Sequence, residues 1–377
     1  RRADFVAWWL VEWGGVRHAS LRTPRPIAWE TLGLVHTPQL LESLAEAETL
    51  GRIFAADPSD VPVDELLSTV RLACGATLNA ARETLKSLVP HLNLLGGFHH
   101  AAPGAAGGFC PVNDVAVAVA ALRQEGFAGQ VVVLDLDAHP PDGLAACFAG
   151  DPSVFLGSLS GSDWGPLPGT VDETLLPEGT GDLAYLAALD ALLGRMPRPA
   201  LAFVIAGSDV LRGDRLGLLG LSLDGVRRRD RRVAVALDGL PAVWLPGGGY
   251  TEDAWRALAG TGMVLARGSL TPIPRYYDPM AARYSKIARR ITPDLLGETE
   301  LTRGDLEEAL GLDAGPAPML ALGYYTAQGI DYALARYGIL DQIRRIGYAN
   351  PHVATDRTGL GDRIRLLGEA DGQEHLL

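Results

Sequence analysis

An apolar, mostly β-branched run that ends in two carboxylates and an imidazole constrains this chain more than any other feature. The run Val131–Leu134 is followed by Asp135, Asp137 and His139 at alternate positions. Such a run predicts a buried strand. Because side chains alternate along a strand, Asp135, Asp137 and His139 are expected to share one face.

Two carboxylates and an imidazole crowded together carry a large desolvation and repulsion penalty unless a cation or hydrogen-bonding partners compensate it. Oxygen and nitrogen donors without a thiolate suit an open catalytic Zn²⁺ or a related divalent ion. The segment therefore predicts a metal site. The alternative is an ordinary strand whose polar end is solvated.

Three further segments place chemically versatile side chains after glycines or after apolar runs. Gly96-Gly97-Phe98 precedes His99 and His100, the run Ala200–Ala206 leads to Asp209, and Pro241–Pro246 leads through three glycines to Tyr250. Glycine lets the backbone approach a ligand closely. Each segment alone also fits a plain interpretation, as surface histidines or a structural turn.

The coarse pattern along the chain alternates strands and helices. Strands are predicted near 130–136, 153–158, 200–206 and 241–246, and helices over 63–88, from Asn113 or Asp114 to about Arg123, and near 143–149, 182–194, 222–237 and 252–266. This alternation predicts an α/β fold with a mostly parallel sheet flanked by helices, in which ligands bind beyond the carboxyl ends of the strands. Asp137, His139, Asp209 and Tyr250 all fall there.

The 377 residues are enough for one large domain and an appendage. We predict a catalytic domain over 1–290 and a small C-terminal α/β region over 291–377. The C-terminal region is expected to hold helices within 291–311 and 328–346 and a strand at 363–367. Its role is left open.

Composition excludes some partners. A net charge of −12 argues against a surface that grips nucleic acid, and the arginine clusters at 227–232 and 283–290 are interpreted as solvated helix faces. No apolar run is long enough to predict a transmembrane span. Three cysteines without paired spacing indicate a reduced, cytoplasmic protein, and the near absence of lysine fits a bacterial source.

Taken together and in this order, these segments resemble the zinc-dependent histone deacetylase family, which shares its fold with arginases. The resemblance covers roughly residues 30–265. It includes Val35-His36-Thr37, Gly108–Asp114 after the histidines, and Leu211–Gly217 after Asp209. It implies an arginase/deacetylase-like fold for this chain and hydrolysis of an amide.

The resemblance also implies roles for individual residues. It assigns Asp137, His139 and Asp209 as ligands of one Zn²⁺, and His99 and His100 as the pair that holds and deprotonates a water. It further assigns Tyr250 as donor to the oxyanion, Asp135 and Asp142 as carboxylates that orient the histidines, and Gly108, Phe109, Leu167, Leu216 and Gly248 as substrate-binding residues. A structural K⁺ is implied near Asp135 and Ser158, although Ser158 equally fits an ordinary strand-end serine.

The residues after His139 bear on two points. Arginases need a further Asp two residues beyond the histidine to hold a second metal, and this chain has Pro141 there, so a two-metal ureohydrolase is disfavoured. Pro140-Pro141 also replace a segment that usually contains glycine in the family. Because proline fixes φ and lacks an N–H, the pairing of Asp142 with His100 is left open.

The predicted function is zinc-dependent removal of acetyl or longer acyl groups from the ε-amine of lysine, in a protein or in a small acylated amine. Leu167 stands where many relatives carry an aromatic tunnel wall, which favours longer acyl chains. Acetylpolyamine amidohydrolase is the alternative, although the apolar Leu216 gives a dicationic amine no partner. A non-catalytic acyl-lysine-binding module is the alternative from another class. The oligomeric state is left open.

Overall fold

The computed structural model describes residues 20–251 and 253–266, isolated positions before residue 20, and three strands between residues 349 and 376. The chain divides into two compact units, one of Trp9–Thr271 and one that joins Arg1–Trp8 with Pro272–Leu377. The boundary predicted between residues 290 and 291 lies outside the described residues, as do the helices predicted within 291–311 and 328–346 and the arginine cluster at 283–290.

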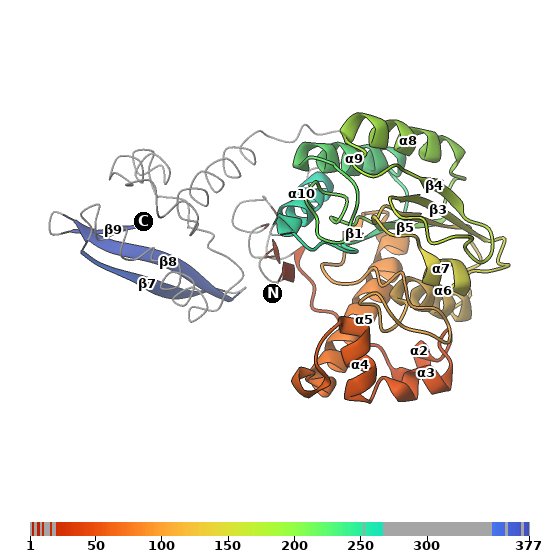
Figure 1. Ribbon diagram of the computed structural model, residues 1–377, viewed down its shortest axis with the longest axis horizontal. Helices are drawn as coiled ribbons and strands as arrows, with labels where there is room; N and C mark the ends of the chain where they lie inside the picture. Colours follow the sequence, from red (N-terminus) through yellow and green to blue (C-terminus); the bar gives the residue numbers. More distant parts are fainter. Residues whose placement is uncertain are drawn as a thin grey trace. The chain divides into compact units, whose positions relative to one another are not determined.

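The larger unit is built on a six-stranded sheet in the order β1-β6-β5-β2-β3-β4, with every pair parallel (Figure 1). The strands are β1 His91–Leu92, β2 Val131–Asp135, β3 Val154–Ser160, β4 Asp172–Leu175, β5 Leu201–Ile205 and β6 Ala242–Leu245. The four predicted strands are confirmed as β2, β3, β5 and β6. The sequence pattern does not predict β1, which has two residues, or the mostly polar edge strand β4.

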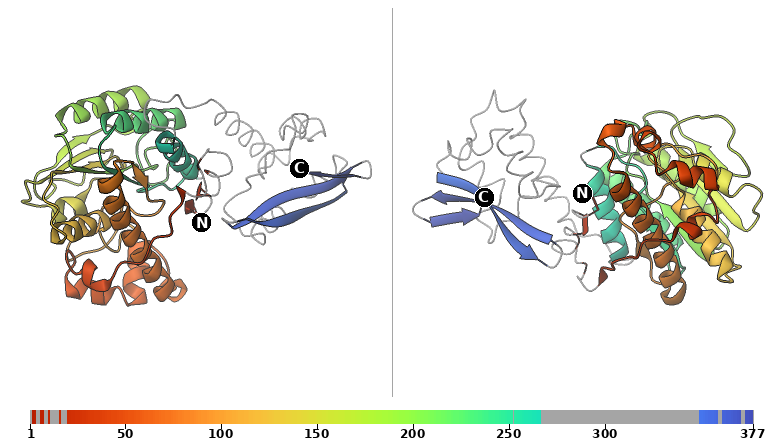
Figure 2. Two further views of the ribbon diagram at one scale, coloured as in Figure 1. Left: turned by 180° about the vertical axis from the view of Figure 1, so that it is seen from behind. Right: turned by 90° about the horizontal axis from the view of Figure 1, so that it is seen from below.

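Helices flank this sheet, with α5 and α6 on one side and α8 and α9 on the other (Figures 1 and 2). The helices are α2 Trp29–Leu32, α3 Pro38–Ser43, α4 Ala47–Phe54, the short 3₁₀ helix η2 Pro58–Asp60, α5 Val63–Ser87, α6 Asp114–Gln124, α7 Asp142–Cys147, α8 Asp182–Arg195, α9 Leu223–Ala236 and α10 Ala254–Ala266. The predicted long helix is α5, which ends where Leu88 adopts a φ of 58°. Asn113 caps α6, because its side chain accepts the N–H of Ala116.

Both faces of the central strands are buried. Val133 and Phe203 belong to the core cluster that α5 and α6 complete. Val132 and Val204 alternate with them, so they face the other layer of helices, and both are 0% exposed. Burial on both faces explains why these strands are continuous apolar runs in the sequence.

The carboxyl ends of β2, β5 and β6 are neighbours in the sheet, which brings their following loops together. The alternation predicts that Asp137 and His139 lie on the strand face, but β2 ends at Asp135. Both residues therefore lie in the loop beyond the strand. The N–H groups of Asp137 and His139 donate to the side chains of Asp135 (3.1 Å) and Asp137 (3.0 Å), and not to a neighbouring strand. Asp209 follows β5 and Tyr250 follows β6.

In the second unit the structure describes an antiparallel sheet of three strands, β7 Ala349–Thr358, β8 Gly361–Ala370 and β9 Gln373–Leu376, in that order. The strand predicted at 363–367 is confirmed within β8. In the described part of the chain, no helix combines the length and apolar character that crossing a bilayer requires.

Helix α9 has a partly solvated face, as predicted for 227–232, since Arg228 and Arg232 are 46% and 40% exposed, but Arg229 in the same cluster forms a buried ion pair. Arg229 and Asp230 are both 0% exposed, and the Arg229 Nε donates to Asp230 Oδ1 at 2.8 Å. Arg229 Nη1 also donates to the carbonyls of Gly207 (2.6 Å) and Leu136 (3.3 Å). The arginine therefore ties α9 to the two loops that carry Asp137 and Asp209.

We expect Asp230→Ala to lower the free energy of unfolding by about 3–5 kcal/mol, because it leaves the Arg229 charge buried without its carboxylate. Urea unfolding followed by circular dichroism measures the loss. The control is Asp190→Ala, which removes the 57% exposed partner of Arg232 and should cost no more than about 1 kcal/mol. Equal losses in the two variants would contradict the prediction.

Candidate functional site

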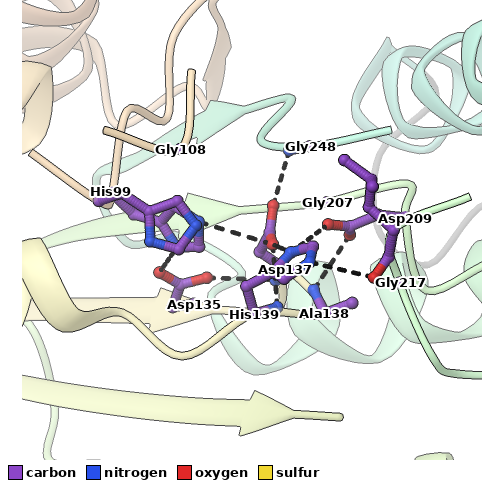
Figure 3. A network of polar contacts seen from close by, with 12 residues as sticks. His99, Gly108, Asp135, Asp137, Ala138, His139, Gly207, Asp209, Gly217 and Gly248 are labelled. Carbon is purple, nitrogen blue, oxygen red and sulfur yellow. Dashed lines mark hydrogen bonds and ion pairs between the residues drawn. The ribbon is translucent and has the colours of Figure 1, made fainter. Parts of the chain in front are cut away.

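Two buried carboxylates and a mostly buried imidazole present their ligand atoms to one point beyond β2 and β5 (Figure 3). One ligand atom each from Asp137, His139 and Asp209 lies within 4.8 Å of the other two. The His139 Nδ1 is 3.0 Å from Asp137 Oδ1 and 3.1 Å from Asp209 Oδ2. The side chains of both aspartates are at most 1% exposed, and that of His139 is 13% exposed.

His139 directs its Nδ1 at this point. Its Nε2 is 3.2 Å from the carbonyl oxygen of Leu216. A carbonyl only accepts, so Nε2 carries a proton in this bond, and Nδ1 faces the two carboxylates. When a cation replaces the proton that Nδ1 shares with the carboxylates, Nδ1 and two carboxylate oxygens are its three ligand atoms, which is the ligand set of a catalytic zinc site.

Electrostatics favour a cation at the same point. Burial and the nearby Asp137 charge together raise the pKa of Asp209 to about 7. Burial lowers the pKa of His139, but hydrogen bonds to Asp137 and Asp209 outweigh this and raise it to about 10. Both shifts show that the protein alone supplies too little positive charge here, so the residues fit a divalent cation.

Backbone amides fix the two carboxylates. Asp137 Oδ2 accepts the N–H of Gly248 at 2.6 Å, and Asp209 Oδ1 accepts the N–H of Ala138 at 3.0 Å. A Cβ on residue 248 would lie 2.5 Å from Asp209 Oδ2, so the loop can approach this closely only with glycine there. The predicted substrate residue Gly248 is thus next to both aspartates.

The adjacent histidines lie beside this cluster, each held by a carboxylate. His99 Nδ1 is 2.8 Å from Asp135 Oδ2, and His100 Nδ1 is 2.6 Å from Asp142 Oδ1. The ring centroids of the two histidines are 4.0 Å apart, and His99 Nε2 is 3.6 Å from Asp137 Oδ1. Pro140-Pro141 therefore do not prevent the pairing of Asp142 with His100.

The two histidines have different electrostatic surroundings. Burial lowers the pKa of His99, but Asp135 and Asp137 outweigh it and raise the pKa to about 9. Burial and the neighbouring His99 lower the pKa of His100. The pair therefore favours one charged and one neutral imidazole.

The buried carboxylate of Asp114, at the start of α6, holds the histidine loop. Asp114 Oδ1 accepts the N–H of Phe98 at 2.8 Å and that of Gly97 at 3.1 Å, and its Oδ2 accepts the Thr77 hydroxyl at 2.6 Å. Nothing in the local sequence marks this contact, since it joins a helix start to a loop 16 residues earlier.

Tyr250 and Phe109 lie together at the site. Their ring centroids are 5.5 Å apart. Burial and the charges of Asp137 and Asp209 raise the pKa of Tyr250, which keeps its hydroxyl protonated and able to donate. Gly108, which precedes Phe109, has a φ of 55°, and a Cβ there would lie 2.3 Å from the His100 ring.

Trp164, three residues before Leu167, places an aromatic ring against the site histidines. The Trp164 ring stacks on His100 with centroids 5.0 Å apart and lies 5.9 Å from the His139 ring. Leu167 is half-buried against the hydrophobic core. Leu216 is 45% exposed and contributes its carbonyl to His139. Residues 164–169 are rich in proline and glycine, so the sequence does not predict the backbone conformation there.

The Ser158 hydroxyl is buried and has no hydrogen-bond partner within the described residues. Ser158 is opposite Asp135 in the pairing of β2 with β3. A buried hydroxyl without a partner is costly unless something binds it. This placement fits an oxygen-lined site for a monovalent cation.

The comparisons agree with this geometry. The histone deacetylase domain model matches residues 1–263, so the chain belongs to the histone deacetylase family. The predicted resemblance and the arginase/deacetylase-like fold are confirmed.

Among relatives, the chain is 30% identical over 280 residues to histone deacetylase 2 of Arabidopsis thaliana, covering 70% of this chain and 72% of that protein. It is 38% identical over 189 residues to an uncharacterized protein of Picosynechococcus, covering 48% of this chain and 62% of that one. The chain thus spans less than two thirds of the length of that relative. Among solved structures, a histone deacetylase homologue complexed with SAHA has a TM-score of 0.59 and 27% identity, covering 72% of this chain and 78% of that one.

Proposed function

We propose that this chain is a zinc-dependent deacylase that hydrolyses the amide between an acyl group and the ε-amine of lysine or a similar amine. The observation that carries the proposal is the buried Asp137, His139 and Asp209 cluster, with His99, His100 and Tyr250 around it. Family membership supports amide hydrolysis in general. The metal, the lysine and the acyl group are part of the proposal.

Asp137, His139 and Asp209 would hold the zinc. When bound, zinc supplies a Lewis acid and lowers the pKa of a coordinated water. His99 and His100, oriented through Nδ1 by Asp135 and Asp142, would hold the attacking water and accept its proton. Tyr250 donates its hydroxyl hydrogen to the oxygen that becomes charged in the tetrahedral intermediate. Near Asp135, the Ser158 hydroxyl would help to hold a structural K⁺.

The substrate enters between aromatic side chains. We propose Phe109 and Trp164 as the walls, with Gly108 and Gly248 at the base and Leu216 at the rim. An apolar rim residue offers no ion pair to the second charge of a polyamine, so an acyl-lysine side chain is favoured over an acetylpolyamine. The acidic net charge supports a substrate that is not nucleic acid. Cytoplasmic location and bacterial origin stay predictions.

The proposal is tested with the purified chain on acetyl-lysine peptides and on acetylated polyamines, with metal content measured in parallel. We expect hydrolysis of the peptides at a higher kcat/KM than the polyamines. The opposite preference would favour the acetylpolyamine amidohydrolase. Tight peptide binding by the metal-loaded protein without hydrolysis would favour the non-catalytic module.

The preference for acyl-chain length tests which residue forms the wall of the substrate tunnel. The preference for longer acyl groups is expected because Leu167 is not aromatic, and the proposed wall residue Trp164 would limit that preference. We expect Trp164→Ala to raise the ratio of octanoyl to acetyl kcat/KM several-fold, because each methylene that the widened tunnel buries contributes about 0.8 kcal/mol. Leu167→Phe serves as the comparison and should leave the ratio unchanged, since Leu167 is half-buried against the hydrophobic core. The reverse pattern would assign the wall to Leu167.

A further inference from the structure

The Asp214 carboxylate joins two loops of the site. Its Oδ2 accepts the backbone N–H of Tyr250 at 2.8 Å. Its Oδ1 accepts the N–H groups of Leu216 at 3.0 Å and Gly217 at 3.1 Å, which closes a turn within its own loop. One side chain thus uses one oxygen for its own turn and the other for the residue that carries the proposed oxyanion donor.

The same turn touches the metal cluster. Leu216, whose N–H binds Asp214, presents its carbonyl to His139 Nε2. The loop Gly247–Tyr250 is also held at Gly248. The N–H of Gly248 donates to Asp137, and its carbonyl accepts the Ser208 N–H at 2.9 Å. The turn at Asp214 therefore links the Tyr250 backbone to His139, in addition to the link from Gly248 to Asp137.

We propose that Asp214 is a positioning residue, which holds the Tyr250 backbone so that its hydroxyl meets the developing oxyanion. The inference rests on the proposed function, since it assumes that Tyr250 donates to the intermediate. A tyrosine has only two side-chain torsions before its ring, so the place of its backbone largely sets the place of its hydroxyl. A misplacement of about 1 Å in such a group costs about 10²-fold in rate.

Asp214→Asn tests the roles of the two carboxylate oxygens separately, because it keeps one oxygen and replaces the other by an NH₂ group. The amide keeps one acceptor for the Leu216 and Gly217 N–H groups, while its NH₂ then faces the Tyr250 N–H, donor against donor. We expect kcat to fall about ten- to a hundredfold, with KM changed less than threefold, and with metal content and melting temperature close to wild type. Asp151→Asn is the matched control, because Asp151 accepts the Ser153 N–H at 2.8 Å in a similar turn away from the site.

A double-mutant cycle with Tyr250→Phe distinguishes positioning from a general structural effect. If Asp214 acts through the Tyr250 hydroxyl, Asp214→Asn should lower kcat less than twofold when that hydroxyl is already absent. An equal loss in both backgrounds, or wild-type kcat in Asp214→Asn, overturns the inference while leaving the proposed function intact. Wild-type kcat in Tyr250→Phe overturns the proposed role of Tyr250 itself, and the inference with it.

A crystal structure of Asp214→Asn provides a readout that does not depend on activity. We expect the Tyr250 ring to be displaced while Asp137, His139 and Asp209 keep their positions. An unmoved Tyr250 overturns the inference. Asp214→Ser, which keeps a short acceptor for the turn, replaces the asparagine variant if the latter does not fold, with the same expected results.

Discussion

Asp209→Ala is expected to lose its bound metal and all measurable hydrolysis, whereas the wild-type chain should hold one tightly bound zinc. Asp209 is one of three protein ligands in the proposed site, and alanine leaves only Asp137 and His139. Two ligands do not make the three-ligand arrangement of catalytic zinc. Elemental analysis after dialysis, on protein at known concentration, measures zinc per chain.

The matched control for this prediction is Asp142→Ala. Asp142 binds His100 at 2.6 Å and is not among the converging metal ligands, so this variant should keep its zinc while losing activity. Two metals per chain in the wild type, or full metal content in Asp209→Ala, would contradict the single-zinc site. Pro141 stands where a second metal would need a carboxylate, which is why we expect one ion.

Tyr250→Phe is expected to lower kcat by about 10² to 10³ while metal content and fold stay unchanged, the range for losing one oxyanion donor. Burial near Asp137 and Asp209 raises the pKa of this tyrosine, so the hydroxyl is protonated at neutral pH and its hydrogen is available to the intermediate. Steady-state kinetics on an acetyl-lysine peptide measures the loss.

Tyr185→Phe is the control for Tyr250→Phe, because it also removes one hydroxyl from a buried tyrosine, on helix α8. It should keep kcat within about twofold of wild type, since Tyr185 is not among the residues that the proposed mechanism uses. Turnover at the wild-type rate in Tyr250→Phe would mean that the Gly247–Tyr250 loop does not face the substrate.

Local sequence pattern determined the secondary structure where burial is extensive and continuous. Val131–Leu134 and Leu201–Ile205 are buried on both faces, so every position is apolar and the strands are visible without a structure. The three-to-four spacing of apolar residues in α5 has the same origin. Strand β4 is not visible in this way, because an edge strand with the sequence Asp-Glu-Thr-Leu carries no apolar signal.

The sequence by itself also determined which residues are candidates for the chemistry. Asp137, His139, Asp209 and Tyr250 follow predicted parallel strands, and the rule that such loops meet at one edge of the sheet brings them together. Only the tertiary structure decided what holds and surrounds them. Trp164 on His100, Asp114 under the histidine loop, Asp214 on the Tyr250 N–H and Arg229 beneath two loops are contacts between segments distant in the chain. Such contacts depend on how loops pack, and a single carboxylate, arginine or tryptophan has no periodic signal in the sequence that reveals its partner.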